Sequence, residues 1–171
     1  KIDIKKSTYY KSLIIGFFIL FTIQLVIITY GYFTPTWDAG HLNRTVNYFH
    51  SYGVIDDMEY MTRYPNNSML TFLLILIRSI PYFGRSNFIL LLINCLLVNL
   101  SGLFTSLSIK NVTSNNRLAL LSYFIIVPLI VLSPWIIVIY SDTFAILFPI
   151  LIFYIFSKKY RDYRDYFFIC F

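Results

Sequence analysis

SLIIGFFILFTIQLVIITYGYF, residues 12–33, governs the architecture of this chain. It contains no charged side chain, and at about 1.5 Å of rise per residue a helix of this length crosses a hydrocarbon core of about 30 Å. Basic residues precede it, as they do in a signal peptide. The run is long for the apolar part of a signal peptide and has no A-x-A cleavage site, so we interpret it as an uncleaved membrane anchor.

Composition extends this interpretation to the whole chain. Of 171 residues, 58% are apolar and 13% are charged, with a mean hydropathy of +0.69. Soluble domains average about 25% charged residues. Long charge-free segments cause the difference, so we predict an integral membrane protein of the all-α class. The formal charge of +6 fits basic residues retained in cytoplasmic loops, and no basic stripe on a soluble fold indicates a nucleic-acid partner.

Three further apolar runs follow, at residues 88–109, 118–140 and 143–156. With residues 12–33 they predict about four spans in a single transmembrane domain, residues 1–171. Residues 34–87 form an outer loop between the first two spans. Pro128 and Pro134 predict a kink in the third span. A new apolar run opens at residues 166–171, so we interpret the chain as the N-terminal portion of a larger protein.

Residues 68–80 are apolar but reach only about 20 Å as a helix, which favours an interfacial helix over a span. Loop charges support this choice, because an outer position for 68–80 leaves ten basic residues inside and four outside. The outer four are Arg44, Arg63, Arg78 and Arg85. This topology places the N-terminus in the cytoplasm and both Asp38 and Asp142 on the outer side. The abundance of Ile, Phe, Asn and Lys indicates an AT-rich genome and a bacterial plasma membrane.

The outer loop contains two candidate interfacial helices. Residues 39–52 carry apolar side chains at helical spacing, and Gly53 is expected to end that helix. Residues 63–68 are predicted to form a turn, with Ser68 as the N-cap of the second helix.

Asp38 is the leading candidate for a catalytic base, because a carboxylate at the end of a span meets a lipid-borne substrate on one side and water on the other. It could instead cap the helix 39–52. Asp142, after Tyr140 and Ser141, has the same two interpretations: contact with acceptor or metal, or a cap for 143–156.

Cations in the outer loop could bind an anionic phosphate, since arginine offers a bidentate fork. Arg63 is the best candidate, whereas Arg78 and Arg85 are expected to snorkel at the interface. The chain has no metal motif: His41 and His50 are not spaced as a ligand pair, and Cys95 and Cys170 lack CxxC spacing.

The order of these parts resembles the N-terminal part of the GT-C glycosyltransferases, membrane enzymes of the dolichyl-phosphate-mannose mannosyltransferase type. Trp37-Asp38 after a span, Arg63-Tyr64-Pro65-Asn66-Asn67, Phe83-Gly84 before a span and Tyr140-Ser141-Asp142 carry the resemblance. It implies transfer of a sugar from a polyprenyl-phosphate donor to a hydroxyl of a glycan, lipid or protein acceptor. Asp38 would be the base, and Tyr64, Pro65 and Asn66 would shape the donor pocket. The remaining substrate-binding candidates are His41, Arg44, Arg63, Tyr140 and Asp142.

Many members of that family carry a second acidic residue beside the loop aspartate, where this chain has Ala39. The resemblance therefore leaves the cofactor open, with a divalent cation as one possibility. Two other interpretations stay open as well. A non-enzymatic transporter or lipid-linked-sugar flippase subunit would place polar residues in mid-span, where the chain has Gln24, Asn94 and Asn99. A fragment of a transferase that is inactive by itself is the third.

Overall fold

The computed structural model describes residues 3–33, 35–80 and 86–170, and every regular element in this part of the chain is a helix. The all-α prediction is therefore confirmed. In chain order the elements are α1 (Lys6–Gly31), α2 (Asp38–Tyr52), α3 (Met58–Arg63), α4 (Asn66–Arg78), α5 (Asn87–Thr113), α6 (Asn116–Ile126), the π-helix η1 (Val127–Val131), the 3₁₀-helix η2 (Pro134–Ile137), α7 (Ser141–Ala145), α8 (Leu147–Ser157) and α9 (Tyr163–Cys170).

Two helices of the described chain, α1 and α5, are long and apolar enough to cross a membrane. They correspond to the predicted runs 12–33 and 88–109: α1 begins six residues earlier and ends two residues earlier than predicted, and α5 begins one residue earlier and ends four residues later. Shorter apolar helical stretches lie at Asn66–Arg78, Asn116–Val131 and Ser141–Ser157.

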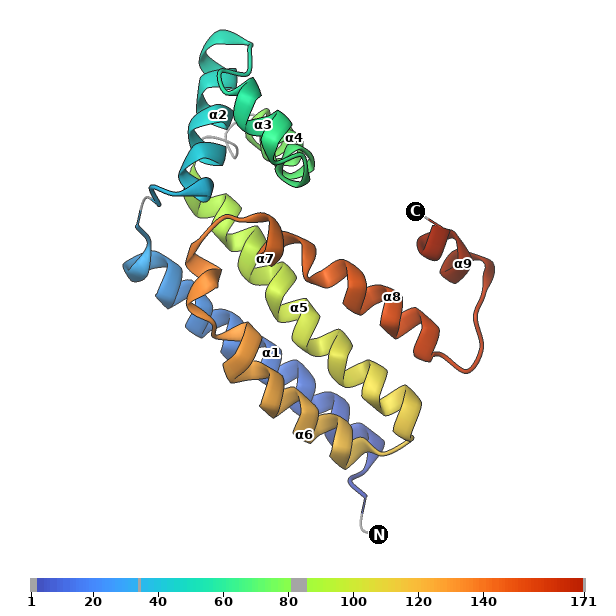
Figure 1. Cartoon of the computed structure of the whole chain (residues 1–171). Helices are drawn as coiled ribbons and strands as arrows, with labels where there is room; N and C mark the ends of the chain where they lie inside the picture. Colours follow the sequence, from blue (N-terminus) through green and yellow to red (C-terminus); the bar gives the residue numbers. More distant parts are fainter. Residues whose placement is uncertain (1–2, 34, 81–85, 171) are drawn as a thin grey trace.

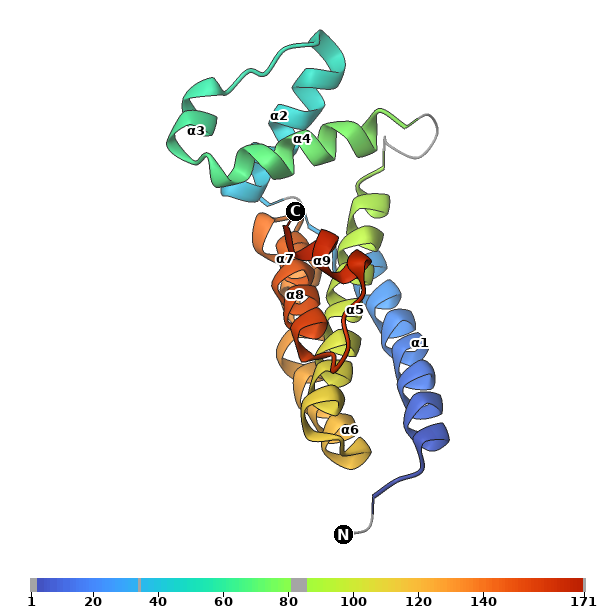
Figure 2. The same ribbon diagram turned by 90° about the vertical axis from the view of Figure 1, so that its right-hand side faces the viewer.

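The helix α5 is the centre of a bundle and packs against α1, α6 and α8. Figure 1 shows these helices running side by side in alternating directions, with the N-terminus and the α5–α6 connection at one end of the bundle. The segment α2–α4, which we call the cap, lies at the other end. In Figure 2, α4 lies across that end and does not enter the bundle between the long helices.

The run 118–140 was predicted as one kinked span, but the structure divides it into α6, η1, η2 and extended backbone at Val138 and Tyr140. Proline explains the division. Pro128 and Pro134 lack the N–H that an α-helix requires four residues after each carbonyl, and their rings clash with the preceding turn.

Two buried amides from other helices bind the carbonyls that this division releases. Gln24 of α1 donates through Nε2 to the carbonyl of Val131 at 2.7 Å. Asn94 of α5 donates through Nδ2 to the carbonyls of Ile136 at 3.1 Å and Val138 at 3.3 Å. A buried carbonyl without a partner costs about 1–3 kcal/mol, so these two side chains stabilise the irregular backbone.

The last apolar run, predicted at 143–156, begins earlier, at Ser141, and is interrupted at Ile146 between α7 and α8. Pro149 accounts for the interruption, because it has no N–H to donate to the carbonyl of Ala145.

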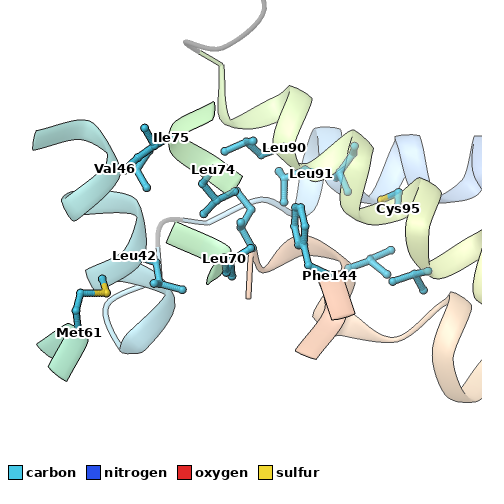
Figure 3. Close-up of a cluster of buried hydrophobic side chains, with 14 of the residues drawn as sticks. Leu42, Val46, Met61, Leu70, Leu74, Ile75, Leu90, Leu91, Cys95 and Phe144 are labelled. Carbon is cyan, nitrogen blue, oxygen red and sulfur yellow. The ribbon is translucent and has the colours of Figure 1, made fainter. Parts of the chain in front are cut away.

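The cap has its own apolar core, which continues into the bundle. Figure 3 shows Leu42 and Val46 of α2 facing α4, which presents Leu70 and Leu74. Phe144 of α7 and the first turns of α5 complete the same cluster of buried side chains. The cap is thereby packed on the end of the bundle at which α7 begins.

Arg78 ties the cap to the bundle instead of snorkelling, which corrects our expectation. Its guanidinium donates to Oδ1 of Asn47 in α2 and to Oδ1 of Asn87 in α5. Asn87 in turn donates to the hydroxyl of Tyr32 at 2.8 Å. Burial lowers the pKa of Arg78. Arg85 lies outside the described residues.

The cap boundaries follow the sequence in part. Gly53 ends α2 as predicted: its φ of +73° is left-handed, and its N–H donates to the carbonyl of Phe49 at 2.8 Å. The helix α3 was missed, and the prediction of Ser68 as an N-cap is wrong. Pro65 already has helical angles (φ −64°, ψ −22°), so α4 begins at Asn66 and Ser68 lies inside it.

Candidate functional site

Asp38 is the first residue of α2, and close backbone packing fixes its place. A Cβ on Gly40 would lie 2.3 Å from the carbonyl oxygen of Pro35, so only glycine fits this position. The N–H of Gly40 also donates to the carbonyl of Trp37 at 2.7 Å. The chain leaving α1 therefore folds back tightly against the start of α2, and Asp38 lies at the turn.

Trp37, not Asp38, is the N-cap residue of α2, and the side chain of Asp38 points toward the bundle. Its Oδ2 accepts a hydrogen bond from the hydroxyl of Tyr140 at 3.3 Å. Asp38 is therefore in contact with the extended backbone segment that precedes α7. This segment leads into Asp142, which was predicted to lie on the same side as Asp38.

A pocket of about 310 Å³ opens beside Asp38, between α2 and α3. Three carboxylates, one guanidinium and three rings line it. The lining residues are Asp38, His41, Asp57, Glu59, Tyr60, Arg63 and Tyr64. Four of the predicted site residues therefore meet around one hollow.

The rings form a wall of that pocket. His41 stacks on Tyr60 with centroids 5.0 Å apart and planes 7° from parallel, and Tyr64 lies 5.0 Å from Tyr60 on α3. Tyr60 is buried, and its hydroxyl accepts a hydrogen bond from Nδ2 of Asn67 at 2.9 Å. Burial, together with the negative charge of nearby Asp38, raises the pKa of Tyr60 to about 12. The phenol is therefore neutral at physiological pH.

One nitrogen of His41 has two partners that require opposite protonation. Its Nδ1 lies 2.7 Å from Nη2 of Arg44 and 3.2 Å from Oδ2 of Asp57. Arginine can only donate, so that contact needs a bare Nδ1, whereas the carboxylate of Asp57 needs Nδ1–H. Only one of the two hydrogen bonds forms at a time. Arg44 is thereby placed behind His41 and does not line the pocket.

Arg63 lies at the exposed rim of the pocket, with Nη2 at 3.3 Å from Oε1 of Glu59. Both side chains are largely exposed, at 67% and 85%. Exposed pairs contribute about 0–1 kcal/mol, so the guanidinium can exchange this carboxylate for another anion at little cost.

The predicted turn residues 64–66 do not all belong to the pocket. Tyr64 lines the pocket, whereas Pro65 and Asn66 start α4, and the side chain of Asn66 reaches Oδ1 of Asn67 at 3.5 Å. The sequence analysis missed Asp57, Glu59 and Tyr60, which line the pocket, and Asn67, which binds the hydroxyl of Tyr60. The tandem asparagines gave no indication of which one faces inward, because that depends on where α4 begins.

Asp142 does not share the pocket of Asp38. It is exposed, accepts from the hydroxyl of Ser141 at 3.4 Å, and lines a separate, mostly apolar pocket of about 260 Å³. Tyr140 lines this second pocket too, while its hydroxyl contacts Asp38 of the first pocket. The two aspartates therefore line separate hollows, and Tyr140 links the hollow of Asp142 to the carboxylate of Asp38.

Within the described residues, no three His, Cys, Asp or Glu side chains come together in a way that could hold a metal ion. Comparisons of this chain with protein-family models, with curated proteins and with solved structures find no match.

Proposed function

We propose that this chain belongs to a membrane glycosyltransferase that transfers a sugar from a polyprenyl-phosphate donor to an acceptor hydroxyl, with Asp38 as the base. The observation that carries the proposal is the position of the Asp38 carboxylate. It is held by Tyr140 at the end of the helical bundle, in a pocket with an aromatic wall and a displaceable arginine.

The proposed topology has four passes, formed by α1, α5, α6 with η1 and η2, and α7 with α8. The cap then lies on the outer face of a bacterial plasma membrane, and the N-terminus lies in the cytoplasm. The excess of basic residues at the inner ends supports this orientation. The position of α4 across the end of the bundle agrees with an interfacial helix.

In the proposed step, the acceptor oxygen attacks the anomeric carbon of the donor sugar. The bond from that carbon to the phosphate oxygen breaks, its electron pair leaves with the polyprenyl phosphate, and the hydroxyl proton goes to Asp38. A single displacement inverts the anomeric centre. Tyr140 occupies one side of the carboxylate and orients the remaining lone pairs.

Ring faces and carboxylates suit the sugar, because apolar C–H groups pack on aromatic rings and hydroxyls donate to carboxylates. Tyr64, which is exposed, would supply such a ring face, and Asp57 an acceptor. The donor phosphate would stay at the rim, where Arg63 releases Glu59 to bind it.

The polar residues of the mid-bundle support this proposal over a transporter. The side-chain amides of Gln24 and Asn94 bind the broken backbone, and Asn99 donates to the carbonyl of Phe17 at 3.0 Å. The NH2 groups of these three side chains are thus used within the protein, and all three side chains are fully buried.

The proposal is tested in membranes that contain the full-length protein, with a panel of radiolabelled polyprenyl-phosphate sugars and membrane acceptors. Asp38→Asn should abolish transfer while membrane insertion is unchanged. Asp56→Asn, an exposed carboxylate outside the pocket, is the matched control and should retain activity. Transfer at the native rate by Asp38→Asn would remove Asp38 as the base.

Sidedness has its own test. In a background with Cys95 and Cys170 replaced by serine, Thr62→Cys should react with an impermeant maleimide added from outside, whereas Asn115→Cys should react only after permeabilisation. Labelling of both from the same side would contradict the four-pass topology.

A further inference from the structure

The second hollow is lined by α5, η1, η2, α7 and their connections, and it has a buried floor and an open side. Val98 and Ile136 form the floor, with exposed fractions of 1% and 0%. Trp135 and Leu129 line the open side and are more than half exposed. In the proposed topology this side faces lipid, near the outer end of the bundle.

The polar groups of this pocket are few, and most are already used. The hydroxyl of Thr143 donates to the carbonyl of Tyr140 at 3.0 Å, and the hydroxyl of Tyr140 donates to Asp38. Among the described residues that line the pocket, Asp142 is the one charged side chain. A ligand here meets apolar walls and a single carboxylate at the mouth.

A single carboxylate in an apolar lining favours one chemical class of ligand over another. A phosphate would face the carboxylate of Asp142 with no lysine or arginine in the lining to compensate, and like charges repel strongly where water is partly excluded. An uncharged head group with hydroxyls can donate to the same carboxylate. The volume, about 260 Å³, is below the usual range of roughly 300–1,000 Å³ for drug-sized ligands and fits a narrow chain.

We propose that this pocket binds the hydrocarbon chain of the sugar acceptor, which is an uncharged, hydroxyl-bearing lipid, and that Asp142 accepts a hydrogen bond from its head group. The inference rests on the proposed function and assigns its acceptor to the lipid class. Tyr140 then links the acceptor to the base, because it lines the pocket of the acceptor chain and its hydroxyl contacts Asp38.

Binding can be measured without catalysis, because the chain has only two tryptophans and one of them lines the pocket. In the full-length protein, Trp37 and any tryptophan outside residues 1–171 are replaced by phenylalanine, so that Trp135 is the sole tryptophan. This variant is placed in nanodiscs and titrated with dodecyl amphiphiles that carry bromine on the chain. The head groups compared are a glucoside and a phosphate.

We expect saturable quenching of Trp135 by the glucoside, with a half-saturating concentration at least tenfold lower than that of the phosphate. Asp142→Asn should reduce this preference to less than threefold. Val98→Phe, which fills the floor, should abolish saturation, whereas Val112→Phe, exposed near the far end of α5, should not. Linear quenching by both compounds, or equal affinity for the phosphate, would overturn the inference. The Asp142→Asn variant leaves the pocket walls intact. Its head-group preference therefore tests the inference even if Val98→Phe does not fold.

Transfer assays separate this inference from the proposed function. With alkyl glucosides as surrogate acceptors, the KM should fall at least tenfold between methyl and dodecyl chains, and Val98→Phe should remove the gain. Transfer that depends on Asp38 but not on chain length would refute the lipid acceptor alone. Saturable quenching with transfer unaffected by Asp38→Asn would refute the proposed function alone.

Discussion

The hydroxyl of Tyr140 lies 3.3 Å from the carboxylate of Asp38, although 102 positions separate the two residues in the chain. The contact joins the first residue of the cap to the last residue before α7. It also gives the candidate base a neutral hydrogen-bond donor that remains in place when an acceptor hydroxyl approaches from the pocket.

Removal of this hydroxyl should impair turnover more than binding. Hydrogen bonds to charged groups contribute about 1.5–3 kcal/mol, which corresponds to roughly a 10- to 100-fold fall in kcat for Tyr140→Phe. The KM for the donor should change less than threefold, because the aromatic ring remains. Tyr30→Phe, whose side chain is 86% exposed, is the control. An unchanged kcat would show that the contact does not position the base.

Gly31, the last residue of α1, and Gly40, in the first turn of α2, should respond very differently to replacement by alanine. At Gly40 the new methyl group would meet the Pro35 carbonyl at 2.3 Å, whereas at Gly31 its nearest neighbour lies at 3.9 Å. We expect Gly40→Ala to lower the free energy of unfolding by about 1–3 kcal/mol and to reduce transfer. Gly31→Ala should do neither. Thermal unfolding in detergent and transfer activity are measured for both variants. Similar effects of Gly40→Ala and Gly31→Ala would contradict the tight turn.

Asn94 should be required for the broken segment to hold its shape. Asn94→Leu places an apolar side chain of similar size in the bundle. It leaves the carbonyls of Ile136 and Val138 without their donor. The expected loss is about 1–3 kcal/mol of unfolding free energy, together with reduced activity through displacement of Tyr140. Asn111→Leu, exposed on the same helix, is the control. Equal stability of the two variants would show that this amide does not stabilise the segment.

Asp3 should make stability depend on pH in the acid range. Burial opposes ionisation of this carboxyl, but hydrogen bonds from the backbone N–H groups of Arg117 and Asn116 outweigh it and lower its pKa. A carboxyl with a lowered folded-state pKa contributes stability above its unfolded pKa, near 3.9, and this contribution is lost as pH falls through the folded value.

Asp3→Asn keeps an acceptor at the start of α6 but cannot titrate. Its unfolding temperature should therefore fall less than that of the native protein between pH 5 and the lowest pH at which both remain soluble. Parallel curves for the two proteins would exclude Asp3 from the acid response.

The sequence predicts the helices of this fold better than their interruptions. The ends of α2 and its glycine cap follow from side-chain spacing and from Gly53 alone, which are local properties. The prolines indicated a kink in the third run, but the positions of η1 and η2 depend on Gln24 and Asn94, which lie far away in sequence.

The same distinction between local and long-range structure applies to the predictions for the site. Asp38, His41, Arg63 and Tyr64 meet because short-range structure in the cap brings them together. The separation of Asp142 from Asp38 could not be foreseen, since it depends on the path of the irregular backbone before α7, which brings Tyr140 and not Asp142 into contact with Asp38. Asn66 was named instead of Asn67 because the resemblance points to Tyr64-Pro65-Asn66, and the predicted N-cap, Ser68, lies three residues after the observed one, Pro65.

The amide contacts of Gln24 and Asn94 have a consequence for biogenesis. The carbonyls of the segment that ends at Tyr140 find donors on both α1 and α5, so we expect a chain in which these helices have not assembled to leave Asp38 without the Tyr140 hydroxyl. On the proposed function, such a chain would attack a lipid-linked sugar more slowly than the assembled protein. Full reactivity would then depend on the assembly of these helices.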